Sequence, residues 1–536
     1  MKRFLKYLIS IITFLIIAFA YYYVALPAIN IHSPGFWFFM IGALVIACII
    51  VGISTLGKSI TANDIPHLLK NKLFALVIGI TTIFILICII GSILSSTMVN
   101  AKKYQEILTI TNRNFSEDIK EISYKDIPIL DKDSAALLGS RTMGSIIEYV
   151  SQFEVGLNYT QINYQGVPVR VTPLRYGSVF KWLANRAKGI PAYIRIDMAT
   201  QEVELVKLEQ GIKYSDSEHF SRYINRYLRF HYPTYIFDTI NFEIDDEGVP
   251  YWICPVKEYT IGLFGGQTIG RAVIVNAITG EQKDYAIQDV PTWVDRVYSA
   301  ELLISLYDYY GSLKHGYWNT VFSQKDALQT TDGYNYLALE NAVWVYTGVT
   351  SVGSDQSNVG FVLMNQRTAE TRFYPISGAE EYSAMGSAEG KVQELGYKAT
   401  FPLLLNIGNE PTYFIALKDA AGLVKKYAMV NIEQYQIVSI GDTVNECEKT
   451  YLEQMKTSGI SVEDTATLPK VTGTIKKIAE GVIDGNSHYY IMLNNNTEIF
   501  DVTVADFIQI IKYNVGDSIT FIYTSGTEAN TVLGIE

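Results

Sequence analysis

Uninterrupted runs of hydrophobic residues occupy most of the first hundred positions. They comprise Tyr7–Ile29, Phe36–Leu56 and Leu73–Ser96, and none of them contains Asp, Glu, Lys, Arg or His. A helix of about 20 residues spans the roughly 30 Å hydrocarbon core of a bilayer. The pattern therefore predicts three membrane helices that form an anchor over residues 1–97. A cleaved signal peptide is the alternative for the first run, but its apolar part is long and two more runs follow.

Basic residues around these runs predict the orientation of the anchor. They precede the first run and lie in the loop Gly57–Lys72, whereas the loop Ala28–Gly35 contains none. The basic residues are Lys2, Arg3, Lys6, Lys58, Lys70 and Lys72. Because short basic loops stay in the cytoplasm, we expect a cytoplasmic N-terminus in the cell membrane and extracytoplasmic residues 98–536. Without charged residues in the runs, a proton relay or ion path has no residues to use.

Further along the chain, short alternating stretches predict strand–turn–strand units. Four such units are Tyr193–Leu208, Ala272–Ile287, Phe361–Ile376 and Tyr427–Ile440. In each, the first strand reaches an Asp or Asn, and in three of them a Thr and then a Glu follow at fixed spacing. These turn residues are Asp197, Thr200 and Glu202; Asn276, Thr279 and Glu281; Asn365, Thr368 and Glu370; and Asn431 alone. Such a side chain bonds its own backbone, and Gly280 supplies a positive φ, so hairpins are predicted.

Each predicted hairpin follows another strand, which in turn follows a stretch with helical periodicity. The helical stretches are Ala135–Phe153, Ser217–Phe230, Ala300–Leu313 and Glu381–Leu395, and the strands are Val167–Thr172, Pro250–Tyr259, Ala342–Val349 and Pro411–Leu417. Two capping-box patterns, Ser215 with Glu218 and Ser377 with Glu380, predict helix starts. We interpret the pattern as a helix plus a three-stranded meander, repeated four times. Unrelated hairpins in an ordinary α+β ectodomain are the alternative.

These observations divide the chain into segments. Residues 98–134 are a juxtamembrane connector, and the repeats cover residues 135–210, 211–290, 291–376 and 377–457. A polar linker over residues 458–470 leads to a β-rich tail, residues 471–536. Its five short strands and one helical stretch predict an OB-like small barrel. The predicted fold class is α+β.

The stretch Val275-Asn276-Ala-Ile-Thr279-Gly280-Glu281 and the order of elements resemble the PepSY family. The resemblance covers roughly residues 135–445. It departs from the family pattern at Gln201 and Ala369, where glycine is missing, and at Asn431, where the threonine is missing. It implies cystatin-like αβββ modules that are extracytoplasmic, non-catalytic and bind or restrain peptidases or other envelope partners. The whole chain also resembles multi-pass membrane proteins of Gram-positive bacteria.

Charge narrows the choice of partner. The net charge is −11 and residues 1–97 contribute +5, so residues 98–536 carry −16. Such an acidic body would repel a phosphate backbone, and the tail adds only three basic residues against eight acids. We therefore expect no nucleic-acid partner and favour another envelope protein or a peptidase.

Candidate chemistry is sparse. No metalloprotease, Walker or nucleophile-elbow motif is present, so the sequence predicts no cofactor and no enzyme. Asp295 and His315 are candidates for acid–base catalysis, although a polar helix-capping network under aromatic packing explains the same residues and is the favoured interpretation. Asp245, Asp246 and Glu247 form an acidic cluster that suggests either a solvated turn or a loose calcium site. The glycine-rich stretch Gly262–Gly270 is interpreted as a hairpin loop, with a phosphate loop as the alternative.

Two tryptophans are candidates for partner binding. Trp293 and Trp318 lie in a stretch rich in aromatic residues, and such rings dominate protein interfaces. The sequence thus predicts a non-enzymatic, membrane-anchored protein that binds or regulates an envelope protein or peptidase. The alternatives are an envelope enzyme near Asp295 and His315, or a small-ligand or ion receptor at Asp245–Glu247.

Overall fold

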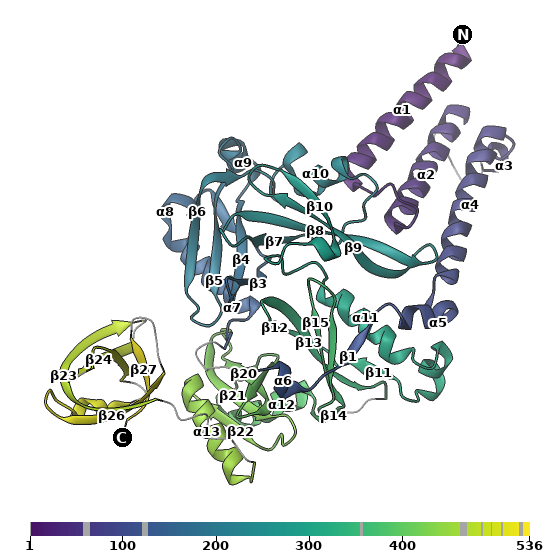
Figure 1. Ribbon diagram of the computed structural model, residues 1–536. Coiled ribbons are helices and arrows are strands. Elements are labelled where there is room, and N and C mark those ends of the chain that lie inside the picture. Colours follow the sequence, from purple (N-terminus) through teal and green to yellow (C-terminus); the bar gives the residue numbers. More distant parts are fainter. Residues whose placement is uncertain are drawn as a thin grey trace.

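The computed structural model describes residues 2–56, 65–120, 127–353, 357–460, 469–483, 486–494, 496–504, 507–524 and 529–535 (Figure 1). Its three parts are a group of N-terminal helices, a body of sheets and helices, and a small C-terminal barrel. The chain is therefore a mixed α+β protein, as the sequence predicted. Lys58 and most of the predicted linker lie outside the described residues.

Three N-terminal helices are long and apolar enough to cross a membrane, which confirms that prediction. They are α1 (Lys2–Ala25), α2 (Pro34–Leu56) and α4 (Lys72–Leu94), with the short α3 (Ile65–Leu68) between the last two. Helix α1 ends earlier than the apolar run because Leu26 adopts a left-handed φ of 48° just before Pro27. Asn71 caps α4, and its side chain accepts hydrogen bonds from the amides of Leu73 and Phe74.

Four sheets of the body share one arrangement: four strands pair antiparallel in the order in which they occur along the chain. The first contains β3 (Thr160–Tyr164), β4 (Val167–Tyr176), β5 (Ile190–Asp197) and β6 (Val203–Ile212), and the second β7 (Asn241–Ile244), β8 (Pro250–Ile261), β9 (Gly265–Asn276) and β10 (Gln282–Ala286). The third contains β12 (Asn335–Leu339), β13 (Ala342–Ser351), β15 (Gly360–Asn365) and β16 (Thr371–Tyr374), and the fourth β19 (Leu403–Ile407), β20 (Glu410–Lys418), β21 (Val424–Asn431) and β22 (Val438–Gly441). The sequence predicted the last three strands of each meander and missed the first.

Short strands extend these meanders. They are β2 (Phe153–Val155) in the first sheet, β11 (Leu328–Thr330) in the third and β18 (Lys398–Ala399) in the fourth, while β14 (Ser357–Asn358) pairs with β17 (Gly378–Ala379). Helices precede the meanders: α7 (Lys132–Ser145) and α8 (Ile147–Val150), α10 (Ile224–His231), α11 (Ala300–Ser312) and α12 (Glu381–Lys391). We call each meander with its preceding helix a module, numbered first to fourth along the chain.

The capping-box predictions were wrong. Helix α10 begins at Ile224, later than the predicted Ser217, and its N-cap is Tyr223. Helix α12 begins at Glu381, as its periodicity predicted, but its N-cap is Glu380 and not Ser377. The buried carboxylate of Glu218 instead accepts hydrogen bonds from the Tyr176 hydroxyl and the Trp182 indole.

Neighbouring modules share their hydrophobic cores. On β8, Cys254 faces a core with the first module, whereas the adjacent Ile253 faces a core with α11 and the third sheet. On β13, Val345 belongs to that same core, while Trp344 faces a core with α12 and the fourth sheet. Because successive side chains of a strand point to opposite faces, the two middle sheets are covered on both sides. The modules therefore form one continuous layered stack.

The segment after the last membrane helix pairs and packs with this stack. It contains α5 (Thr97–Gln105), β1 (Ile110–Asn112) and α6 (Phe115–Asp118). Strand β1 pairs parallel with β16 at the edge of the third sheet, with Ile110 opposite Thr371. Phe115 is buried in the core shared by the third and fourth modules. The sequence predicted only a connector over residues 98–134, and these contacts have no counterpart in that prediction.

The C-terminal tail closes into a five-stranded barrel with its own core. Around the barrel the strands are β23 (Lys470–Ile483), β24 (Asn486–Leu493), β25 (Ile499–Thr503), β27 (Asn530–Ile535) and β26 (Ser518–Thr524). A short 3₁₀ helix, Ile508–Lys512, lies between β25 and β26 in the chain. Helix α13 (Val444–Thr457), which precedes the barrel in the chain, packs on β21 and β22.

Candidate functional site

The turn predicted from the spacing of Asn, Thr and Glu has the same hydrogen bonds in the first three modules. In the second module, Asn276 Oδ1 accepts from the amides of Ile278 and Thr279, and Thr279 Oγ1 accepts from the Glu281 amide. The corresponding bonds form at Asp197 and at Asn365.

Backbone geometry explains why these turns tolerate the loss of glycine. Gln201 and Ala369 have φ values of 63° and 61°, close to the 79° of Gly280 in the equivalent position. The side-chain hydrogen bonds of the turn therefore hold residues with a Cβ in a conformation that favours glycine. In the fourth module, Asn431 differs: its Oδ1 accepts from the Gln434 amide and its Nδ2 donates to the Tyr451 hydroxyl.

Asp295 and His315 contact different partners. Asp295 is 1% exposed, and its Oδ2 accepts a hydrogen bond of 2.6 Å from the Asn163 amide. His315 lies on the surface, with Nε2 3.2 Å from Oδ2 of Asp326. Within the described part of the chain, no hydrogen bond or ion pair joins Asp295 to His315, so the predicted catalytic pair is not assembled.

Asp295 instead pairs with a residue that the sequence analysis did not single out. Glu243, at 0% exposure, accepts hydrogen bonds from the backbone amides of Asp295 and Arg296, each 2.9 Å long. Burial, followed by repulsion from Glu243, raises the pKa of Asp295 well above its ordinary value. Burial likewise raises the pKa of Glu243. These contacts tie the segment before α11 to β7 and do not expose a carboxylate to solvent.

The acidic cluster is a backbone turn between β7 and β8. Asp245 Oδ1 accepts from the amides of Glu247 and Val249, and the Asp245 carbonyl accepts from the Gly248 amide. The Asp246 carbonyl accepts from the side chain of Gln165, which connects the turn to the first module. Asp245 thus uses its carboxylate to close the turn, as expected for an Asx turn.

The two candidate tryptophans lie in different environments. Trp293 is half-buried and packs against Tyr251, with ring centroids 5.0 Å apart. Trp318 is 59% exposed and stacks on Phe322, which is 76% exposed, at a centroid distance of 5.7 Å. Of the two, Trp318 is therefore the ring that is largely exposed to solvent.

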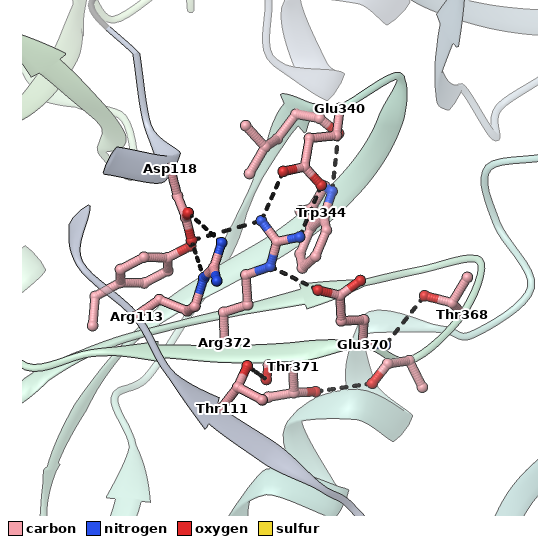
Figure 2. A network of polar contacts seen from close by, with 12 residues as sticks. Thr111, Arg113, Asp118, Glu340, Trp344, Thr368, Glu370, Thr371 and Arg372 are labelled. Atoms are coloured by element: carbon pink, nitrogen blue, oxygen red, sulfur yellow. Dashed lines mark hydrogen bonds and ion pairs between the residues drawn. The ribbon is translucent and has the colours of Figure 1, made fainter. Parts of the chain in front are cut away.

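A buried arginine fastens the segment after the membrane helices to the third module (Figure 2). The guanidinium of Arg372 forms ion pairs of 2.8 Å with both Glu340 and Glu370, and it lies 4.4 Å from the centre of the Trp344 ring. Asp118 of α6 lies 3.7 Å from Arg372 and also accepts a hydrogen bond from the Tyr374 hydroxyl. This network holds α6 against the sheet edge where β1 pairs.

The glycine-rich stretch Gly262–Gly270 contains the turn of the β8–β9 hairpin, as predicted, and this turn docks on the membrane helices. The amides of Leu263 and Phe264 donate hydrogen bonds of 2.8 and 3.1 Å to the Ser95 hydroxyl, just after α4. The Leu263 carbonyl lies 2.9 Å from Nδ1 of His32 in the loop between α1 and α2. A Cβ at Gly91 would lie 2.9 Å from Leu263, so this glycine allows the close approach.

Two arginines of α10 complete the contact with the membrane helices. Arg229 is 8% exposed and donates to the carbonyls of Leu26, Tyr232, Pro233 and Tyr235. Because helix α1 ends just before Leu26, these cations lie where the helix dipole favours positive charge.

Arg226 lies over the ring of Tyr23 at 4.0 Å and donates to the Tyr23 carbonyl. Neither arginine was predicted as a contact residue, because no local sequence pattern relates them to residues 203 positions away.

Comparison with protein-family models finds no matching family, and comparison with curated proteins finds no match.

Proposed function

We propose that the protein is a non-enzymatic, membrane-anchored extracytoplasmic protein whose modules bind or regulate an envelope protein or a peptidase. In this proposal the modules are PepSY-like repeats and the C-terminal barrel is OB-like. The observation that carries the binding role is the exposed, stacked pair Trp318 and Phe322. Exposed aromatic rings that are held rigid are typical anchors of protein interfaces.

The repeated strand order and the shared turn support the interpretation as repeats. Three turns have the same side-chain hydrogen bonds, although two of them lack the glycine that their conformation favours. Unrelated hairpins have no reason to share both features. In the barrel, β25 pairs parallel with β27 and antiparallel with β24, an order that suits an OB-like barrel.

The proposed orientation rests on the basic loops and on the junction at Ser95 and Arg229, which lies at the opposite ends of the membrane helices. A cysteine introduced at the exposed Ser458 tests it, since Cys254 and Cys447 are buried and Cys48 and Cys88 lie in membrane helices. A membrane-impermeant thiol reagent should label intact cells of the Ser458→Cys variant. Labelling only after lysis would contradict the orientation.

Photo-crosslinking in native membranes tests the binding role. A photoreactive residue at Phe322 should yield a crosslinked envelope protein or peptidase, and Trp318→Ala should reduce its yield at least about tenfold. Tyr435, 55% exposed on the fourth module, is the control position and should not yield the same product. Crosslinking to lipid alone at Phe322, or equal yields from both positions, would refute the role of this surface.

The non-catalytic part of the proposal is supported by the separate partners of Asp295 and His315. The ion-receptor alternative has little support at Asp245, because its carboxylate already accepts two backbone hydrogen bonds.

A further inference from the structure

A polar cavity of about 640 Å³ lies where the first, third and fourth modules meet. Its walls include Arg170 of β4, Arg296 before α11, Tyr336 of β12 and Lys418 of β20. The volume falls in the range of small-molecule binding sites, roughly 300–1,000 Å³. None of the candidate catalytic, metal-binding or partner-binding residues predicted from the sequence lines it.

Arg170 is an unusual residue in this wall. It is 6% exposed, and the two hydrogen bonds of its guanidinium run to neutral acceptors, the Leu130 carbonyl at 3.3 Å and Gln161 Oε1 at 3.4 Å. No carboxylate forms an ion pair with it among the described residues. Burial lowers the pKa of Arg170 to about 10, so the side chain remains charged at neutral pH. Asp131 and Asp133 interact with Arg170 electrostatically but do not contact it as ion pairs. A buried charge with two long hydrogen bonds and no carboxylate in direct contact is costly unless something else supplies an acceptor.

A second guanidinium lines the same cavity. The Arg296 side chain lies over the Tyr336 ring at 5.4 Å, and its Nη2 donates a long hydrogen bond of 3.3 Å to the Tyr336 hydroxyl. Its Nε has no partner among the described residues, and neither does the buried Nε2 of Gln161 beside Arg170. Gln161 lies outside the cavity lining, so the unused donor capacity at the cavity is that of the two arginines.

The charges of the wall favour an anion with one charge. Lys418 pairs with Asp131, and Lys398 pairs with Glu389 outside the cavity. The lining side chains comprise five cations and three acids, and Glu389 neutralises one of these cations from outside the cavity. One positive charge therefore remains in excess. The remaining lining charges are Lys132, Asp133, Arg170, Arg296 and Glu301. A dianion would exceed this charge, whereas a monoanion would balance it.

We propose that this cavity binds a small organic acid with one carboxylate and an apolar body. The carboxylate accepts hydrogen bonds from Arg170 and Arg296, because guanidinium groups match the planar carboxylate. The apolar body packs against Phe401, Leu403 and Phe414, which line the fourth-module side. This inference is independent of the proposed partner surface at Trp318.

The proposal can be tested with the full-length protein in detergent. The ligands are 3-phenylpropanoate and a panel of aliphatic and aromatic monocarboxylates. Isothermal titration should detect saturable binding of at least one acid, and its neutral amide should bind at least about tenfold more weakly. A phosphate ester of the same body should also bind more weakly. Binding of the amide as tight as the acid, or no binding of any acid, would overturn the proposal.

Variants connect the binding to the cavity. Arg170→Met and Arg296→Met should each weaken binding of the acid at least about tenfold, and the second serves if the first does not fold. Arg175→Met is the matched control, because Arg175 lies on the same strand β4 but does not line this cavity. Equal affinity in wild type, Arg170→Met and Arg296→Met would place the acid elsewhere and refute the site. Binding of a hydrophobic peptide only through its C-terminal carboxylate, and not of free acids, would refute the small-acid ligand.

Discussion

Two buried arginines occupy similar depths in the protein but have different surroundings. Arg229 is 8% exposed and Arg170 is 6% exposed, and within the described chain neither forms an ion pair with a carboxylate. Arg229 donates to four backbone carbonyls, with bonds as short as 2.6 Å, whereas Arg170 has two bonds of 3.3 and 3.4 Å. Burial lowers the pKa of both side chains.

The comparison indicates that Arg229 has a structural role, whereas Arg170 has hydrogen-bond donors that the protein does not use fully. Around Arg229 the backbone supplies acceptors from α1 and from the turn after α10, so the charge stabilises the junction with the membrane helices. Around Arg170 the protein supplies too few acceptors, and the remaining donor capacity lies at a cavity. Removing Arg229 should therefore reduce mainly the stability of the protein, whereas removing Arg170 should reduce mainly the binding of a ligand.

The largest expected effect follows from Arg229→Met. Carbonyls of Leu26, Tyr232, Pro233 and Tyr235 lose their donor, so we expect the free energy of unfolding to fall by about 3 kcal/mol. Arg170→Met, as the comparison, should change it by less than about 1 kcal/mol, since few hydrogen bonds are lost. Chemical denaturation of the detergent-solubilised protein measures both. Equal losses in the two variants would remove the distinction between the sites.

Arg372 provides a third buried arginine, paired with carboxylates. Arg372→Met should lower the free energy of unfolding by about 2 kcal/mol, because the buried Asp118 loses a cation and two further carboxylates lose their partner. Arg113→Met is the control: Arg113 also pairs with Asp118 but its side chain is 49% exposed, so a smaller loss than in Arg372→Met is expected. The same denaturation experiment should rank the two variants in this order.

Asp295 is a buried acid, so its protonation should make the stability of the protein depend on pH. Its pKa is raised by burial and then by repulsion from Glu243, so the native state holds its proton to higher pH than the unfolded state. Its contribution is present at acidic pH and is lost as pH rises through the native pKa. From about pH 5 to pH 8, wild type should therefore lose about 1 kcal/mol more stability than Asp295→Asn. A slope in Asp295→Asn parallel to that of the wild type would refute this account.

The smallest expected change in stability comes from variants of the shared turns. These variants change the backbone strain and keep the side-chain hydrogen bonds. Gln201→Gly and Ala369→Gly keep every side-chain hydrogen bond of the turn but relieve a positive φ, so each should stabilise the protein by about 0.5–1 kcal/mol. Gly280→Ala should destabilise it, since its Cβ would also lie 2.4 Å from the Tyr214 ring. Thermal unfolding of the three variants shows whether each one stabilises or destabilises the protein. Destabilisation by Gln201→Gly or Ala369→Gly would contradict the claim that these residues are strained.

Local signals in the sequence predicted the local parts of the fold. The membrane helices follow from long apolar runs, and the turns at Asn276 and Asn365 follow from side chains that bond their own backbone. The capping boxes failed because tertiary contacts of Glu218 with Tyr176 and Trp182 replaced its local role.

The candidate sites depend on distant residues. Glu243 and Asp295 meet across 52 positions, and the cavity at Arg170 is built by residues from Pro128 to Lys418. Neither arrangement has a spacing that a single sequence reveals, because the contacts arise only when the modules stack. Strand β4 contains two arginines, Arg170 and Arg175, and nothing local in the sequence shows that Arg170 is the one at the cavity.

The pairing of β1 with β16 imposes an order on biosynthesis. Thr111 contacts Thr371 across 260 positions, so strand β1 leaves the ribosome long before its partner exists. Until the third module is complete, this segment beside the membrane carries unpaired backbone groups, which invite association with other chains. A chain truncated before residue 371 should therefore leave Phe115 without its core and be degraded, even though two complete modules and all three membrane helices are present.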